Sequence, residues 1–144
     1  MATFGGVQIM QLRTEKTMTE QDVRNWLDEY GRAWVDSDPD QVVTLFAETA
    51  TYRETPYDEP MRGRHEIRAY WQKYAVETHA DIEFESQVWA VRNDTAIAGW
   101  QARYTLQATG ARVSLDGTFR LVFSSETGAL QCTVLEEWWH RKEM

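Results

Sequence analysis

Glu54 and Tyr52 lie two residues apart in a short predicted strand, so they share one face of it. A carboxylate beside aromatic rings loses hydration, which raises its pKa, and such a base suits removal of a proton next to a carbonyl group. Tyr30, on a predicted helix, carries a hydroxyl that can donate to a ligand oxygen. Two structural alternatives stay open: Glu54 as an exposed carboxylate paired with Arg53 or Arg62, and Tyr30 as a core residue bonded to a backbone carbonyl.

The chain is rich in large rings, with seven Trp, six Tyr and five Phe among its 144 residues. Large rings are costly to leave in water and hard to pack without gaps. Their surplus indicates either a heavily aromatic core or the wall of a ligand cavity. The candidates for ligand binding are Trp34, Phe46, Tyr52, Trp71, Trp100, Phe119 and Trp138.

Other kinds of site are not predicted. The sequence has no metal-ligand spacing, phosphate-binding loop or nucleophile elbow, so no cofactor and no metal is expected. A net charge of −8 without a cluster of Lys and Arg argues against nucleic acid and anionic membranes as partners. No apolar run approaches the ~20 residues that cross a bilayer. Cys132 is the one cysteine, which fits a reducing compartment and predicts a cytoplasmic protein.

Helices are predicted in the first half of the chain. The first begins at a Thr19 cap and turns Val23, Leu27, Tyr30 and Trp34 to one face. A second begins at Asp38-Pro39, with an apolar side formed by Val42, Val43, Leu45 and Phe46. A strand from Ala50 to Glu54 and a turn-rich loop from Thr55 to Gly63 precede a third, whose face carries Ile67, Tyr70, Trp71 and Tyr74.

From Asp81 onward the apolar period changes from 3.6 to 2. Turns at Asn93-Asp94, Thr109-Gly110 and 126–128 separate the alternating segments, the last of which runs through Trp139. Helices followed by an antiparallel meander predict an α+β fold with the helices on one face of a curved sheet. Residues 1–17 lack a periodic apolar face and are expected to form a mobile N-terminal extension before a single domain, 18–144.

Two segments carry a resemblance to a known family. LFAETATYRETPYDEPMRGRHEIRAYW and LDGTFRLVF…LEEWW look like SnoaL-like domain proteins of the nuclear transport factor 2-like superfamily. The resemblance implies a cone-shaped fold in which three N-terminal helices pack on a curved, mainly antiparallel sheet. It also implies a pocket for a small hydrophobic molecule and assembly into a homodimer.

Set against the ketosteroid isomerases of this superfamily, the resemblance gives Tyr30 the role of oxyanion donor and Glu54 that of proton-carrying base. The family's second donor, a protonated aspartate, falls on Phe119, which cannot donate. Asp116, three residues earlier, is the remaining candidate acid. Odd spacing places it on the opposite strand face unless a bulge at Gly117 turns it inward.

The resemblance favours a cofactor-independent enzyme that transfers protons on a hydrophobic carbonyl compound, in the manner of an isomerase or cyclase. A non-catalytic binding module or dimeric scaffold with the same cavity is the alternative. A protein-interaction surface on the outer face of the sheet is a third possibility. The residue patterns of limonene epoxide hydrolase and scytalone dehydratase do not match, because no strand carries Arg-x-Asp and His65, His79 and His140 are widely separated.

Overall fold

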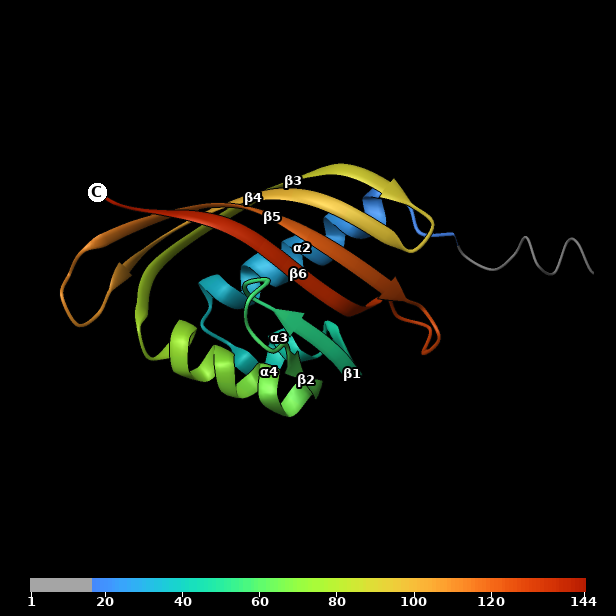
Figure 1. Ribbon diagram of the computed structural model, residues 1–144, viewed down its shortest axis with the longest axis horizontal. Coiled ribbons are helices and arrows are strands. Elements are labelled where there is room, and N and C mark those ends of the chain that lie inside the picture. The colour runs from blue at the N-terminus through green and yellow to red at the C-terminus, as the bar shows by residue number, and fades with distance from the viewer. Residues whose placement is uncertain (1–16) are drawn as a thin grey trace, which may run out of the picture.

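A strongly curved sheet wraps around the helices on its concave side (Figure 1). In the computed structural model, which describes residues 17–144, the six strands are ordered β2-β1-β6-β5-β4-β3. The elements are α2 (Glu20–Val35), α3 (Pro39–Val43), β1 (Phe46–Arg53), β2 (Met61–Arg62), α4 (Gly63–Trp71), a π-helical turn (Gln72–Val76), β3 (His79–Arg92), β4 (Thr95–Leu106), β5 (Arg112–Ser124) and β6 (Gln131–Glu143). The predicted α+β class is confirmed, while the predicted N-terminal extension lies, apart from Thr17, outside the described residues.

Helix α2 forms the floor of the concave side. It begins where predicted, because the Thr19 hydroxyl accepts from the Asp22 amide at 3.1 Å and the Asp22 carboxylate accepts from the Thr19 amide at 2.9 Å. Its predicted apolar face is buried, and Tyr30 and Trp34 lie on the last turns of that face. The helix therefore directs two aromatic side chains towards the sheet.

The boundary between α3 and β1 differs from the prediction. Helix α3 ends at Val43, and β1 starts at Phe46 instead of Ala50. The Leu45 carbonyl accepts hydrogen bonds from the Trp26 indole at 2.9 Å and from the Cys132 amide at 2.8 Å. These two bonds draw the backbone out of the helix and into the sheet, so Phe46 begins a strand.

The predicted third helix consists of two pieces. Helix α4 begins at Gly63, whose φ of 80° lies in the left-handed region, and the chain continues into the π-helical turn after Trp71. Ile67 and Trp71 are buried as expected, but Tyr74 is 46% exposed because the wider turn rotates it away from their face. No helix within residues 17–144 has the length and hydropathy of a membrane span.

Strands β3 to β6 form the predicted meander of antiparallel neighbours. Bulges in β3 shift its alternation, so Ala90 is exposed where an inward position was predicted, and Val91 packs against the core instead. The first long strand then pairs with the last: β1 runs parallel to β6, with Tyr52 beside Leu135. This pairing brings the end of β1 next to the middle of β6, where the candidate site lies.

Candidate functional site

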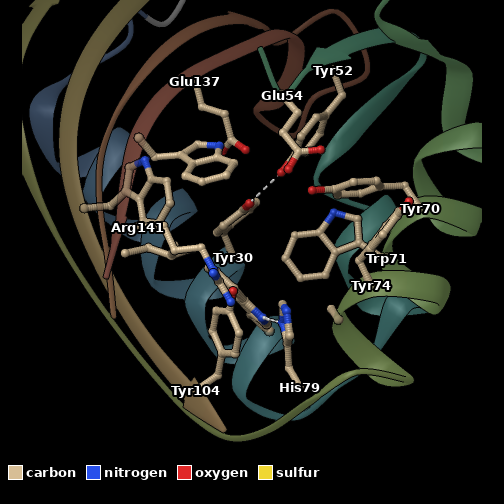
Figure 2. Close-up of a pocket in the computed structure, with 15 residues that line it drawn as sticks. Tyr30, Tyr52, Glu54, Tyr70, Trp71, Tyr74, His79, Tyr104, Glu137 and Arg141 are labelled. Carbon is tan, nitrogen blue, oxygen red and sulfur yellow. Dashed lines mark hydrogen bonds between the residues drawn. The ribbon is translucent and has the colours of Figure 1, made fainter. Parts of the chain in front are cut away.

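A pocket of about 170 Å³ opens between α2, α4, the π-helical turn and the concave face of the sheet (Figure 2). Most of its lining is aromatic: Tyr30, Trp34, Tyr52, Tyr70, Trp71, Tyr74, Trp100, Tyr104 and Trp139. The polar lining residues are Glu54, His79, Glu137 and Arg141. A cavity of this size suits a molecule of one or two rings, since an engineered cavity of about 150 Å³ holds benzene.

Tyr30 of α2 and Tyr52 of β1 meet at the wall of this pocket. Their hydroxyl oxygens are 2.9 Å apart and hydrogen-bonded, and both side chains are almost completely buried. Burial raises the pKa of both tyrosines well above the usual value, and Glu137 raises it further. Both hydroxyls are therefore neutral. One proton lies between the two oxygens, which leaves the other free to donate to a ligand.

Glu54 follows directly after β1 and lines the pocket with Tyr52, as the alternation predicted. Figure 2 shows its carboxyl facing the Tyr70 hydroxyl. Partial burial raises the pKa of Glu54, and the Tyr70 hydroxyl opposes that shift. Of the two alternatives for Glu54, the ion pair with Arg53 or Arg62 does not form; Arg62 instead pairs with Glu59.

Glu137 of β6 is the residue that the sequence prediction missed. It is 6% exposed and is the one fully buried charged residue among residues 17–144. Burial raises its pKa well above the usual value, and the nearby Glu54 adds to the shift. An acid on the inner face of a strand breaks the apolar-inside rule. The signal was the period of two from the buried Leu135, which places positions 137 and 139 inside.

Two predicted site residues lie on the wrong face. Trp138 is 48% exposed on the outer face, because the alternation turns Glu137 and Trp139 inward. Asp116 is also exposed on the outer face. The pairing of β4 with β5 runs through Gly117 without a bulge, so nothing rotates Asp116 inward.

Phe46 and Phe119 are buried core residues that do not line the pocket. Phe119 stacks on Trp100 with ring centroids 5.2 Å apart and lies edge-on to Tyr30 at 5.4 Å. It therefore supports the wall from behind, because a layer of rings is needed to hold the lining rings in place. The other predicted aromatic positions, Trp34, Tyr52, Trp71 and Trp100, all line the pocket.

His79 was not assigned a role from the sequence, and it lines the far end of the pocket. Its Nδ1 accepts from the Trp34 indole at 3.3 Å, and its ring stacks on Tyr104 with centroids 3.7 Å apart. Burial lowers the pKa of His79 to about 4, so the imidazole is neutral and carries its proton on Nε2. This end of the pocket thus offers a neutral donor.

Donors dominate the pocket. Besides the hydroxyls and His79, the indole N–H groups of Trp71 and Trp100 are buried and have no partner within residues 17–144. Unsatisfied buried donors favour a ligand that brings acceptor oxygens. In the same part of the chain no three His, Cys, Asp or Glu side chains are grouped to hold a metal ion.

The geometry has relatives among known proteins. A family model described as the SnoaL-like domain matches residues 23–130. Among curated proteins, no sequence matches the chain. One similar solved structure is SalBIII, an epoxide hydrolase/cyclase-like enzyme of pyran ring formation in salinomycin, with 19% identity, coverage of 87% of this chain and 98% of that one, and a TM-score of 0.73.

Two further structures share the architecture. A Δ5-3-ketosteroid isomerase from Mycobacterium sp. is 12% identical, covers 85% of this chain and 98% of its own, and has a TM-score of 0.70. A type 2 hexachlorocyclohexane dehydrochlorinase (LinA) is 6% identical over 86% of this chain and 87% of its own, with a TM-score of 0.73. At such identities the likeness establishes the fold alone.

Proposed function

The chain belongs to the SnoaL-like domain family, and from this premise we propose that it is an enzyme for proton transfer on a small hydrophobic carbonyl compound. Members of the family bind small molecules, and the similar structures include an isomerase and a cyclase-like enzyme. The observation that carries the proposal is the position of Glu54, a carboxylate that faces an aromatic pocket beside tyrosine hydroxyls.

In the proposed reaction, Glu54 removes a proton from the carbon next to the carbonyl group. The C–H electron pair forms a carbon–carbon double bond, and the carbonyl electrons move onto the oxygen. Tyr30, held by its bond to Tyr52, donates to that oxygen as negative charge develops. Glu54 then returns its proton to carbon at the same or another position, so no cofactor or outside reactant is consumed.

Deuterium exchange tests this proposal without knowledge of the natural substrate. The protein is incubated in D₂O with 1-indanone or 1-tetralone, and incorporation next to the carbonyl is followed by NMR. Glu54→Gln should lower the protein-dependent rate by at least about 100-fold, because general bases contribute 10²–10⁴-fold. Tyr30→Phe should lower it by about 100-fold through the lost oxyanion donor.

The matched control is Asp116→Asn, which removes a carboxylate from the outer face of the sheet and should leave the rate unchanged. The affinity of Glu54→Gln for the ketone should stay within about threefold of the wild type, a difference below 1 kcal/mol. Wild-type exchange rates in Glu54→Gln would overturn the mechanism. Binding of the ketones without any exchange would favour the alternative, a non-catalytic binding protein.

A further inference from the structure

Glu137 presents an unexplained carboxyl group inside the pocket. Its side chain is 6% exposed, and within the described chain no hydrogen bond or ion pair reaches its carboxyl. Figure 2 shows the group directed into the cavity from β6. A buried polar group without a partner is destabilising by about 1–3 kcal/mol, so such groups commonly have a role at a site.

The neighbours of Glu137 define its chemistry. Tyr30 on α2, Tyr52 and Glu54 from the β1 segment, and Tyr70 on α4 are the titratable groups that interact with it. On β5 its direct cross-strand partner is Phe119, which does not titrate. No cation among the described residues pairs with it. The surroundings are rings, hydroxyls and a second acid, and all of these favour the neutral form of Glu137.

The two carboxyl groups of the pocket therefore differ in state. Glu54 is only half-buried and lies beside the Tyr70 hydroxyl, which favours its ionised form. Glu137 is enclosed and holds its proton. A neutral carboxylic acid is a donor, and none of the groups around it accepts its proton. The acceptor must then come from the ligand.

We propose that Glu137 is a second catalytic residue of the pocket, a neutral acid that donates to the same ligand oxygen as Tyr30. This inference rests on the proposed proton-transfer function for its catalytic meaning. It places the acid on β6, one strand away from Phe119. The ligand it selects is a one- or two-ring compound whose oxygen is, or becomes, negatively charged, and it disfavours a cationic ligand.

Binding of three naphthalene derivatives separates a neutral acid from a carboxylate. The probes are 2-naphthol, naphthalene and 2-naphthylmethylammonium, measured by calorimetry at pH 7. Wild-type protein should bind 2-naphthol at least about tenfold more tightly than naphthalene, since a donor–acceptor pair contributes about 1–1.5 kcal/mol. Glu137→Leu should remove this preference, and Glu137→Gln should keep part of it through its amide N–H.

The variants and the cation make the outcome decisive. An unchanged preference for 2-naphthol in Glu137→Leu would overturn the proposal. Tight binding of the ammonium probe that is lost in Glu137→Leu would also overturn it, because Glu137 would then be a carboxylate. Circular dichroism confirms folding of both variants. If the preference for 2-naphthol depends on Glu137 but no ketone exchanges deuterium, the proposed reaction fails while the donor role stands.

Discussion

Glu54 and Glu137 are chemically the same side chain in two environments of one pocket. Glu54 stays in contact with solvent and with a hydroxyl, whereas Glu137 is enclosed by rings and other acids. Environments that push two carboxyl groups apart in pKa give one site both a base and an acid. The difference arises from burial, so it should appear in the stability of the protein as well as in its chemistry.

Glu137→Gln should raise the melting temperature at pH 8 and change it little at pH 4. The folded-state pKa of Glu137 lies above its unfolded value, so its favourable contribution is present below the unfolded pKa and is lost as pH rises through the folded pKa. Glutamine keeps the shape and cannot ionise. Thermal unfolding at the two pH values checks this prediction.

Glu136→Gln is the control on the same strand. Glu136 is partly exposed and pairs with Arg120 at 2.7 Å, so its replacement should lower stability slightly at pH 8. Equal responses of the two variants at pH 8 would contradict the assignment of Glu137 as the buried acid.

At this scale the sequence predicted half of the site. Glu54, Tyr30 and Tyr52 line the pocket because alternation and helical spacing report which side chains share a face. Asp116 and Trp138 lie outside because neighbouring positions in a strand point in opposite directions, and no bulge intervenes. Glu137 was missed because hydrophobic patterning cannot identify a buried acid, which only the paired strands and helices enclose.

Among the elements, β5 and Trp100 of β4 depend on a single glycine. Trp100 lies directly opposite Gly117, and a Cβ atom at position 117 would be 2.5 Å from the indole Cε2. Gly99 is covered on the other face of the sheet by Trp89, which is 60% exposed. The two glycines thus accommodate one fixed ring and one free ring.

Gly117→Ala should destabilise the protein by about 1–3 kcal/mol, the usual effect of overpacking a core. The buried Trp100 cannot move aside without distorting the pocket. Gly99→Ala should have an effect of less than about 1 kcal/mol, because Trp89 can swing into solvent. Urea unfolding of both variants checks the difference, and a larger loss for Gly99→Ala would show that Trp89 is the fixed ring.

The boundaries of the elements show where sequence patterns stop being informative. The meander was predictable because each strand pairs with its neighbour in sequence. The start of β1 at Phe46 was not, because it depends on bonds from Trp26 and Cys132 to the Leu45 carbonyl. The π-helical turn also escaped prediction, since one additional residue per turn leaves no distinct apolar period.

The whole molecule exposes one large face of its sheet. Trp89 and Trp138 are 60% and 48% exposed, and both lie on the outer face, where Gly99, Thr118 and Trp138 are cross-strand neighbours. Exposed tryptophans on a sheet face are typical of a surface that another protein covers. The homodimer expected from the family resemblance would use this face.

The double variant Trp89→Ser/Trp138→Ser should be monomeric at micromolar concentrations at which the wild type is a dimer. The reason is the loss of the two large apolar side chains that association would bury. Analytical ultracentrifugation provides the measurement. Tyr57→Ser is the control, since Tyr57 is 95% exposed on a loop, and its removal should leave the dimer intact. A monomeric wild type would refute the prediction.

The parallel pairing of β1 with β6 also sets when the pocket can come into existence. Glu54 and Glu137 are separated by most of the chain, and β6 is the last strand to leave the ribosome. Hairpins β3–β4 and β4–β5 can form as they emerge, but closing the long loop between β1 and β6 is entropically slower. Until then the rings of α2 lack part of their cover. A nascent chain therefore carries an exposed aromatic helix through most of its synthesis, and chaperones that bind such surfaces would meet it during that interval.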